Sequence, residues 1–513
     1  MRRSLPARYR AGRDAIGPNR KDAPLLTGDY DIAWLQMFRE VGRSGVALQA
    51  HIRQLLVAAI ENGHLSAGRR LPSSRRLASI LGIARNTATS AYEQLVQEGY
   101  LHSHERSGVF VAPVAAALRA GAVAAPGANA RDWGPHFAMR PSRLLHISKP
   151  RDWQGYPYPF LFGQFDPGLF PIQSWRESVA TASSVSSVND WAGDLIDEDD
   201  PELVAQLRAR VLPRRAVWAA PDEVMITIGA QQGLYLAIRL LAGDGTPVAM
   251  EEPGYPDARH MIRMAGGRLH LLGVDADGAV PDAGLAGCRV AVLTPGRQCP
   301  TTATMSALRR RAVLAAARAH DITVIEDDYD ADLFQEGPAV PPLKSADTEG
   351  RVIYIGSLSK ALAPGLRLGY VVAPAPVIQE MRALRRIMLR HPPSNNQRAM
   401  AMFISLGHYR AHLRRVAQVL AERAAVVDRL LPLRLPACRW QRGPGAASYW
   451  ISGPPGLDAR AMAAAASAEG VLVEPGDVFF DAAERGRGCF RLGFSSIRTD
   501  RIEEGLLRLG RLI

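Results

Sequence analysis

Lysine is scarce in this sequence, although the chain is basic. Its formal net charge is +12, yet only four of its 62 Lys and Arg residues are lysines: Lys21, Lys149, Lys344 and Lys360. Arginine cannot lose its proton in a protein and so cannot act as an amine nucleophile, whereas lysine can. Lys360 follows an apolar run and lies in a Ser/Gly-rich turn. It is therefore either a chance surface lysine or a reactive amine of the kind that forms Schiff bases.

Cysteine and long apolar runs are scarce as well. The four cysteines lie far apart, at positions 288, 299, 438 and 489, which excludes a paired zinc or redox motif and is typical of a reducing compartment. There is no run of about 18 apolar residues, so the pattern excludes a membrane-spanning helix. Residues 1–30 are Arg-rich without an apolar segment, so no signal peptide is visible. We expect a cytoplasmic protein.

Length and charge distribution indicate several parts. A chain of 513 residues predicts two or more domains. Residues 1–112 hold 16 Lys and Arg against 9 Asp and Glu, which indicates a polyanionic partner or a solvated basic tail. We expect residues 1–43 to be a disordered basic extension. The Ala/Gly/Pro-rich residues 113–157 have the composition of a linker.

Residues 44–112 have the spacing of helix, tight turn and helix. Ser73 or Ser74 can cap a helix that reaches Leu81, and Gly82 permits the turn. The next helix is predicted from Arg85 to about residue 98. Its apolar face comprises Ala88, Ala91, Tyr92 and Leu95. An ordinary three-helix unit has this spacing too, but a helix-turn-helix places its second helix in a DNA major groove.

The segment "GRRLPSSRRLASILGIARNTATSAYEQLVQEGYL" resembles the winged helix-turn-helix of GntR-type transcription regulators, a likeness that extends over residues 46–112. The resemblance implies an α+β winged helix-turn-helix that binds double-stranded DNA. The implied DNA contacts are Arg75, Arg85, Thr87 and Gly108, and Asn86 adjoins them at the start of the recognition helix.

Two positions in this segment differ from the pattern of these regulators. Ala84 stands where a capping Ser is usual. The wing reads Arg106-Ser107-Gly108 in place of Gly-Ser-Gly, which adds a charge at Arg106 that can contact phosphate.

From residue 158 onward, short β-rich runs alternate with longer helical ones. The runs are 224–228, 247–251, 289–293, 322–328 and 351–356. This alternation predicts an α/β domain built on a parallel sheet.

Several residues near the ends of these runs suit a pyridoxal phosphate site. Such a site needs an amine, an acid for the pyridine nitrogen, an aromatic face and a phosphate cradle. Asp327 ends one apolar strand, Lys360 follows the next, and Tyr255 lies on a turn. Arg367 can bind a phosphate dianion, and residues 229–231 open a helix, where backbone N–H groups bind anions. Each residue alone has a structural explanation, but their order favours a shared site.

Residues 158–513 resemble a fold-type I aminotransferase domain with a smaller C-terminal α+β subdomain. The motifs "GAQQ", "EEPGYP", "EDDYD", "GSLSK" and "PGLRLGY" occur in the order of MocR/GabR-type regulators. The resemblance implies that Lys360 forms the Schiff base with pyridoxal 5'-phosphate and Asp327 pairs with the pyridine nitrogen. Tyr329 would contact the 3-hydroxyl, Tyr255 would stack on the ring, and Arg491 would bind an effector carboxylate. The implied phosphate cradle is Gly229, Ala230, Gln231, Ser357, Ser359 and Arg367.

Two loops depart from this pattern. A "GYGDPAG"-like loop is replaced by "GDLIDEDDPELVAQLR", and "SHQFPTG" has become "GRQCPTT", which introduces Arg297, Cys299 and Thr302. Both border the effector side, so the sequence leaves effector identity and turnover open.

The favoured function is a DNA-binding regulator that senses an amine or amino acid through pyridoxal phosphate. The alternatives are a catalytic aminotransferase with an appended head, and a regulator for which the cofactor itself is the signal. The resemblance also implies a homodimer, in which the heads can cross to the partner's large domain.

Overall fold

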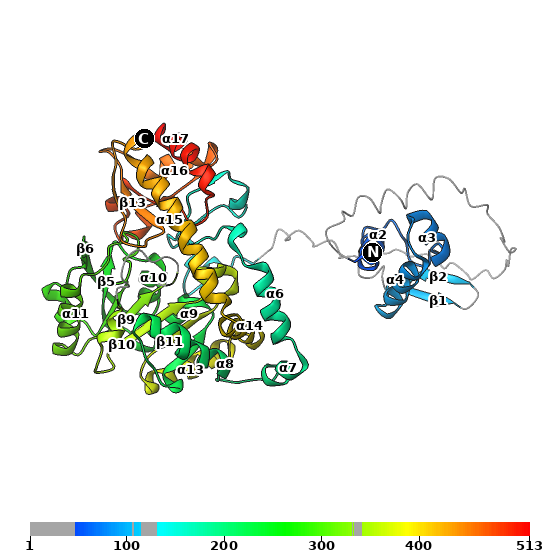
Figure 1. Cartoon of the computed structure of the whole chain (residues 1–513), viewed down its shortest axis with the longest axis horizontal. Coiled ribbons are helices and arrows are strands. Elements are labelled where there is room, and N and C mark those ends of the chain that lie inside the picture. The colour runs from blue at the N-terminus through cyan, green and yellow to red at the C-terminus, as the bar shows by residue number, and fades with distance from the viewer. Residues whose placement is uncertain (1–46, 105–106, 114–130, 331, 333–340) are drawn as a thin grey trace, which may run out of the picture. The chain divides into compact units, whose positions relative to one another are not determined.

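The structure, a computed structural model, describes residues 47–104, 107–113, 131–330, 332 and 341–513 (Figure 1). The chain divides into two compact units, Met1–Ala138 and Met139–Ile513. The expected extension 1–43 and residues 114–130 of the Ala/Gly/Pro-rich stretch lie outside the described residues. No helix in the described ranges is both long enough and apolar enough to cross a membrane.

The predicted linker extended too far. Residues 139–157 belong to the second unit, where Trp153 is buried against Leu161 and Leu472. The Ala/Gly/Pro bias that suggested a linker ends near residue 130, and aromatic residues that can be buried follow it.

The first unit is a helix-turn-helix with a two-stranded wing. Its elements are α2 (Leu48–Glu61), α3 (Ser74–Leu81), α4 (Arg85–Gln97), β1 (Leu101–His104) and β2 (Gly108–Val111), and the two strands are antiparallel. Ser73 caps α3 by accepting a hydrogen bond from the Arg76 N–H, and Gly82 ends α3 with φ +65°. Ala84 gives α4 no side-chain cap. The predicted apolar face of α4 is buried: Ala88, Ala91, Tyr92 and Leu95.

The second unit is built on an eight-stranded sheet in the order β4-β11-β10-β9-β8-β5-β6-β7. The strands are β4 (Val224–Thr227), β5 (Pro247–Glu252), β6 (Arg268–Asp275), β7 (Gly278–Ala279), β8 (Val290–Leu293), β9 (Thr323–Asp328), β10 (Val352–Ser357) and β11 (Gly369–Val372).

The sheet is mixed: the five predicted runs form strands that share one direction, and two strands outside those runs have the opposite direction. β11 runs antiparallel to both β10 and β4, and β7 runs antiparallel to β6. Only residues 358–368 separate β10 from β11, which is too short for the crossover that parallel strands need. The short connection places Lys360 between these two strands.

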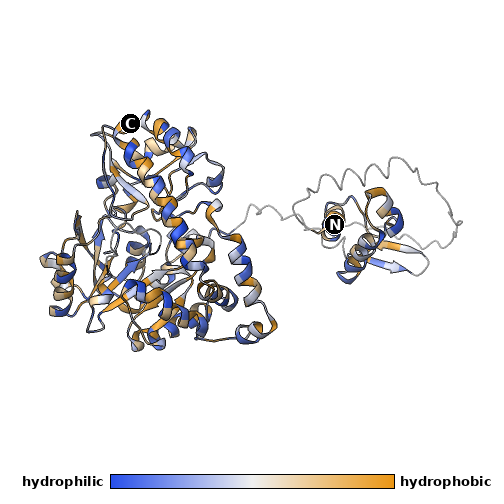
Figure 2. Ribbon diagram, in the orientation of Figure 1, coloured by the Kyte–Doolittle hydropathy of each residue, from blue (hydrophilic) through white to orange (hydrophobic). Residues whose placement is uncertain are grey.

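Helices cover both faces of this sheet (Figure 2). One face carries α9 (Gly229–Leu241), α10 (Pro256–Met264) and α13 (Ala375–Leu389); the other carries α8 (Pro201–Gln206), α11 (Ala307–Ala319) and α14 (Ser394–Ser405). Successive strand residues alternate between these layers, as β10 shows: Ile353 and Ile355 pack toward α9, while Tyr354 packs toward α14. Both faces are therefore apolar, and polar residues concentrate at the strand ends.

A smaller α+β subdomain follows, as expected. Its antiparallel sheet has the order β12 (Arg439–Gln441), β13 (Ser448–Ser452), β16 (Cys489–Gly493), β15 (Glu474–Pro475), and β14 (Val471–Leu472) pairs in parallel with β3 (Tyr158–Pro159). The helices α15 (His408–Arg434), α16 (Ala459–Ala468) and α17 (Ile502–Gly510) complete it. In the β15–β16 register, Glu474 lies directly opposite Arg491.

Candidate functional site

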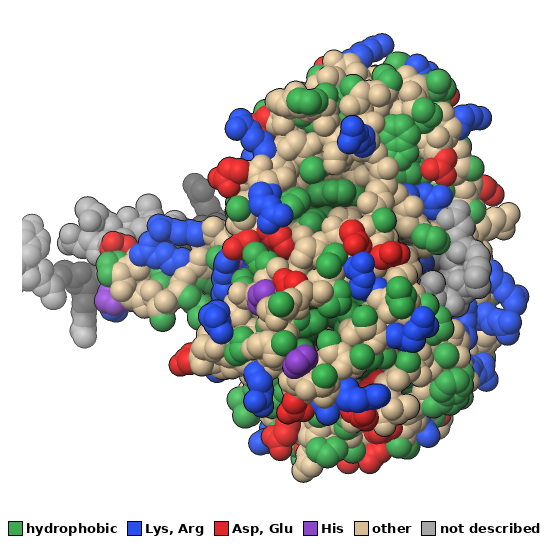
Figure 3. Space-filling view, turned by 90° about the vertical axis from the view of Figure 1, so that its left-hand side faces the viewer, with side chains coloured by type: hydrophobic (Ala, Val, Ile, Leu, Met, Phe, Trp, Pro, Cys, Tyr) green, Lys and Arg blue, Asp and Glu red, His purple; other side chains and the backbone are tan. Residues whose placement is uncertain are grey.

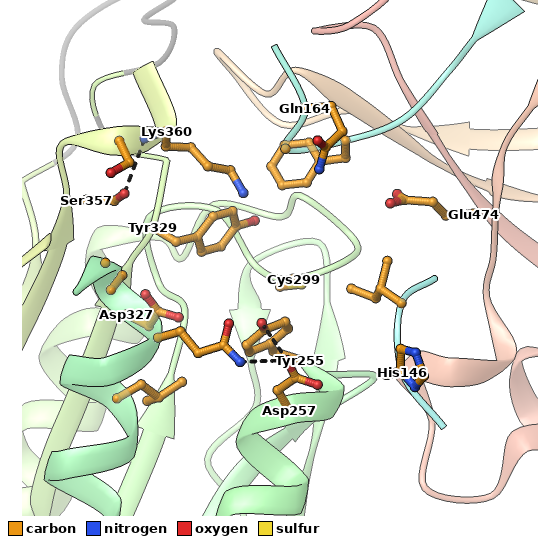
Figure 4. Close-up of a pocket in the computed structure, with 18 of the residues that line it drawn as sticks. His146, Gln164, Tyr255, Asp257, Cys299, Asp327, Tyr329, Ser357, Lys360 and Glu474 are labelled. Atoms are coloured by element: carbon orange, nitrogen blue, oxygen red, sulfur yellow. Dashed lines mark hydrogen bonds between the residues drawn. The ribbon is translucent and has the colours of Figure 1, made fainter. Parts of the chain in front are cut away.

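A cavity of about 520 Å³ lies at the carboxyl ends of the central strands, between the large sheet and the smaller subdomain (Figure 4). All eleven residues predicted for the cofactor and effector site line it: Gly229, Ala230, Gln231, Tyr255, Asp327, Tyr329, Ser357, Ser359, Lys360, Arg367 and Arg491. Most of them lie at the ends of β9 and β10, in α12 (Ser359–Leu362) and at the starts of α9 and α10, and Arg491 comes from β16 in the sheet of the smaller subdomain.

Lys360 lies in α12 (Ser359–Leu362), directly after β10, and its side chain enters the cavity (Figure 4). Its backbone N–H donates to Ser357 Oγ at 3.3 Å. Its Nζ lies 4.5 Å from the centroid of the Phe162 ring and 5.4 Å from that of Tyr329. Burial lowers the pKa of this amine, with Arg491 adding to the effect and Asp330 opposing it. The surroundings therefore favour the neutral, nucleophilic form of Lys360.

Space around the amine is tight. A Cβ at position 163 would lie 2.7 Å from Lys360 Nζ, and φ at this glycine is +72°. Both the backbone conformation and the close approach therefore require Gly163.

Asp327 lies near the end of β9 and is 7% exposed. Its Oδ1 atom is buried and has no hydrogen-bond partner among the described residues. Burial raises its pKa to about 7, and the neighbouring Asp328 adds to this. Asp328 itself is paired with Arg215 and accepts a hydrogen bond from Tyr354 Oη at 2.8 Å. Asp327 is thus the carboxylate left available to the cavity, and a buried acceptor without a donor suits a protonated ring nitrogen.

The predicted phosphate cradle is assembled at the start of α9. Gly229 has φ +71°, and a Cβ there would lie 2.8 Å from Arg367 Nη2. Arg367 also donates from Nη2 to the Ile228 carbonyl oxygen at 3.1 Å. An arginine fork beside a helix N-terminus is a suitable site for a phosphate dianion. Ser359 differs from the prediction in its contacts, because its hydroxyl binds both the backbone N–H and C=O of Leu368.

An aspartate that sequence reasoning missed holds the predicted stacking residue. Tyr255 Oη donates to Asp257 Oδ2 at 3.0 Å, and Gln231 Nε2 donates to the same oxygen at 2.9 Å (Figure 4). Burial, followed by the Asp257 charge, raises the pKa of Tyr255 and keeps the phenol neutral. The signal for Asp257 was its place two residues after Tyr255 in "EEPGYPDAR".

Arg491 is already paired, which the sequence did not predict. Its Nε donates to Glu474 Oε2 at 2.7 Å, and the two side chains are 4% and 6% exposed. The guanidinium lies 4.5 Å from the Phe162 ring centroid and 4.8 Å from that of Phe479. Burial alone would lower the pKa of Arg491, but Glu474 keeps it above its ordinary value. The signal for Glu474 was an acidic residue within the apolar run "VLVEP".

The segment assigned to the linker also reaches the cavity. His146, Ile147, Ser148 and Lys149 line it, so two of the four lysines of the chain are in one pocket. His260 Nε2 contacts the carbonyl oxygen of Leu145 at 2.7 Å and so anchors this segment to α10.

One of the two loops that depart from the expected pattern, "GRQCPTT", makes specific contacts. Arg297 forms an ion pair with Asp330 at 3.1 Å. Thr302 has φ +64°, an unfavourable conformation for a β-branched residue. Its Oγ1 accepts a hydrogen bond from the Gly443 N–H at 2.9 Å, which offsets this cost and joins the loop to the smaller subdomain.

In the first unit, the residues predicted to bind DNA lie around the start of α4. Arg75, Arg85 and Asn86 are exposed and Thr87 is half-buried. Within the described residues, Arg75 and Arg85 have no hydrogen-bond or ion-pair partner. Gly108 has φ +107°, and Arg106 lies outside the described residues.

The second unit presents a different surface. On the face shown in Figure 3, basic and acidic side chains are interspersed and form no broad patch of one sign. Nothing on that face is typical of a phosphate-binding surface.

Comparisons with known proteins define the class of this protein. Residues 48–111 match the family model of bacterial regulatory proteins of the gntR family, and residues 172–509 match that of aminotransferase class I and II. The combination is that of a helix-turn-helix transcription regulator with an aminotransferase-like domain.

Individual relatives agree. The chain is 43% identical to the HTH-type transcriptional regulator TauR of Rhodobacter capsulatus over 91% of its own length and 96% of that protein. It is 33% identical to the probable rhizopine catabolism regulatory protein MocR of Rhizobium meliloti, over 74% and 76% of the two chains. The chain therefore belongs to the MocR-type family of transcription regulators.

A solved structure supports the cofactor. The α-aminoadipate aminotransferase LysN of Thermus thermophilus, complexed with N-(5'-phosphopyridoxyl)-L-leucine, matches with a TM-score of 0.67 and 28% identity, over 74% of this chain and 98% of that one. The aminotransferase fold implies pyridoxal phosphate. The partnerless Asp327 oxygen, the buried Lys360 amine and the cradle at Gly229 and Arg367 fit that group.

Proposed function

We propose that the second unit senses an amine effector through pyridoxal phosphate bound at Lys360, and that effector binding changes how the winged helix binds its operator. The observation that carries this proposal is one cavity that holds a half-buried lysine of lowered pKa and a buried carboxylate oxygen without a donor among the described residues. Perturbed groups of this kind concentrate at functional sites.

Each side chain has a proposed part in holding the cofactor. Arg367 and the N–H groups at residues 229–231 would bind its phosphate, and Asp327 would accept from its ring nitrogen. Tyr255, fixed by Asp257, would cover one face of the ring. Bound pyridoxal phosphate supplies an aldehyde carbon that bonds reversibly to an amine, either Lys360 or an effector. Because burial lowers the pKa of Lys360, the surroundings favour the neutral amine that this bond needs.

The segment before residue 150 offers a route from the cavity to the head. His146 to Lys149 line the cavity, and the same segment continues along the sequence into the connection with the first unit. An effector that contacts these residues would bias the position of the connection. The effector and the operator are coupled in this way only when each of them binds one arrangement of the protein more tightly than the other.

We further propose a homodimer that binds two half-sites through the two heads. A single winged helix contacts few base pairs, so a pair of heads would supply useful specificity. The contacts would come from Arg75, Arg85, Asn86, Thr87 and the wing, since Arg75, Arg85 and Asn86 are exposed and Thr87 is half-buried.

Titration of the purified holoprotein with amines tests this function, with cofactor absorbance and operator affinity measured in the same samples. We expect amines to change both. An absorbance change with sustained formation of keto product and no change in DNA affinity would instead favour the catalytic aminotransferase. Changes in DNA affinity on cofactor removal alone would favour the cofactor as signal.

A further inference from the structure

Glu474 alters the chemistry of the effector end of the cavity. It lies opposite Arg491 on the neighbouring antiparallel strand, so the strand register itself holds the two side chains together. Both are almost fully buried, and Arg491 Nε donates to Glu474 Oε2 at 2.7 Å. The arginine that would otherwise attract an effector carboxylate is therefore neutralised by a built-in carboxylate.

The carboxylate of Glu474 also faces the cavity. Figure 4 shows it pointing inward from the smaller subdomain, toward the space enclosed by Lys360, Tyr329 and Cys299. A carboxylate has room for about four hydrogen bonds. Among the described residues, its only hydrogen bond is the one that Oε2 accepts from Arg491. Neither oxygen of Glu474 is among the fully buried side-chain atoms that lack a hydrogen-bond partner.

Arg491 and Glu474 are almost equally buried, but several other groups also contact Arg491. Its guanidinium lies between the rings of Phe162 and Phe479, at 4.5 and 4.8 Å from their centroids, and Nη1 is 3.9 Å from Cys299 Sγ. Lys149 is the further cation at this end, and it is exposed, so water screens its charge. Glu474 thus has unused hydrogen-bonding capacity at the cavity, beside an arginine that also contacts two rings and a thiol.

We propose that Glu474 is a specificity-determining residue, and that the effector is a short aliphatic diamine. This inference rests on the proposed sensing function. One amine would approach the Lys360 end, the methylene chain would pass Phe162 and Ile147, and the second ammonium group would donate to Glu474. A charge-assisted bond in a desolvated pocket is stronger than a neutral one. An effector carboxylate would meet a negative oxygen and an arginine that is already paired.

Three ligands that share a 3-aminopropyl chain test the proposal: putrescine, butylamine and γ-aminobutyrate, which end in an aminomethyl, a methyl and a carboxylate group. Affinity for the full-length holoprotein is measured by isothermal titration calorimetry and by cofactor absorbance. We expect putrescine to bind most tightly and γ-aminobutyrate most weakly. A protein that prefers γ-aminobutyrate would overturn the proposal, while sensing of amines would stand. A protein that binds none of the three would overturn the proposed function and this inference together.

The variant Glu474→Gln assigns the preference to one residue. It should weaken the binding of putrescine by about tenfold or more, because a charged partner is lost from a desolvated contact. It should strengthen the binding of γ-aminobutyrate, because Arg491 is released from its ion pair. Glu469→Gln, at an exposed position after α16, is the matched control and should leave the ranking unchanged. Glu474→Asp keeps the charge and should keep the ranking, even if Glu474→Gln does not fold. An unchanged ranking in a folded Glu474→Gln protein would overturn the role of Glu474.

Discussion

The two units place their functional charges in opposite surroundings. In the first unit, Arg75 and Arg85 are exposed on a small domain whose core is apolar, with Ile52, Leu56 and Leu95 fully buried. In the second unit, Asp327 and the Arg491–Glu474 pair lie inside the protein, whereas Arg367 of the predicted phosphate cradle is exposed: Asp327 is 7% exposed, and burial raises its pKa to about 7.

The difference teaches what a substitution can affect in each unit. A solvated arginine that contacts DNA is not needed for the fold, so its removal should change binding alone. A buried charge has lost its hydration, and this free-energy cost is offset only when a partner of opposite charge or a hydrogen-bond partner is present. Substitutions in the pocket should therefore change stability and ligand binding together.

The largest effect is expected at Lys360. Lys360→Ala removes the buried amine, so covalent attachment of pyridoxal phosphate, measured by borohydride reduction and peptide mapping, should fall from complete to none. Lys149→Ala is the control, because Lys149 lines the same cavity but is exposed. A reduced adduct on Lys149 in the unchanged protein would show that the wrong lysine has been assigned.

The next effect distinguishes a functional charge from a stabilising one. The folded-state pKa of Asp327, about 7, lies above the ordinary 3.8, so the folded protein binds this proton more tightly. The resulting stability is fully present below about pH 4 and is lost as pH rises through 7. Asp327→Asn replaces the carboxyl group with an amide that does not titrate, so the variant does not lose this stability as pH rises. At about pH 8, the free energy of unfolding of the cofactor-free variant should exceed that of the cofactor-free parent by up to roughly 4 kcal/mol.

Denaturant unfolding at about pH 5 and pH 8 measures this difference. The buried Glu251 and Glu326, whose pKa values burial also raises to about 7, titrate in both proteins, and the charge of Glu251 adds to the rise in the pKa of Asp327, so the pH dependence is compared between the two proteins. With pyridoxal phosphate present, the order should reverse, because the neutral amide cannot balance a ring N–H cation. An advantage of Asp327→Asn that is the same at both pH values would contradict the role of this carboxylate.

Much of the pocket was predictable because it depends on local rules. Asp327 and Lys360 follow successive apolar strands, and neighbouring strands bring their ends together whatever the distant structure is. The strand β11 was not among the predicted runs, and an apolar run looks the same in either strand direction. Only the short connection from β10 determines the direction of β11.

The residues that were missed depend on distant contacts. Glu474 appears in sequence as one acidic residue in a short strand, and only the β15–β16 register places it opposite Arg491. His146 was assigned to a linker because composition was averaged over 113–157, although the bias ends earlier. Asp257 is significant only through the side chains of Tyr255 and Gln231 that fold onto it.

In the head, the expected effect concerns binding alone. Arg85→Ala should weaken operator binding by about 1–3 kcal/mol if Arg85 contacts a base, and should reduce the salt dependence if it contacts only phosphate. Arg53→Ala is the control, because Arg53 is already bonded to Glu98 at 2.5 Å. Fluorescence anisotropy across a range of salt concentrations measures both quantities. The unfolding temperature should remain that of the parent, and a large drop would show that the charge of Arg85 serves the fold.

The smallest effect concerns the start of α4, where the head has a correctable defect. Ala84 has φ −66° and ψ 138°, the extended conformation of a helix N-cap, but no side chain to accept a hydrogen bond. Ala84→Ser should supply an acceptor for the N–H of Asn86 or Thr87 and stabilise the head by about 1 kcal/mol. For a domain of this size that is a rise of roughly 4–8 °C in its unfolding temperature. Ala47→Ser, at the equally uncapped start of α2, should give a similar gain away from the DNA-binding residues. Calorimetry of the full chain should show the head transition move while that of the second unit stays in place. A shift of both transitions would mean that the units unfold together, and charges in the head could then no longer be treated separately from those in the pocket.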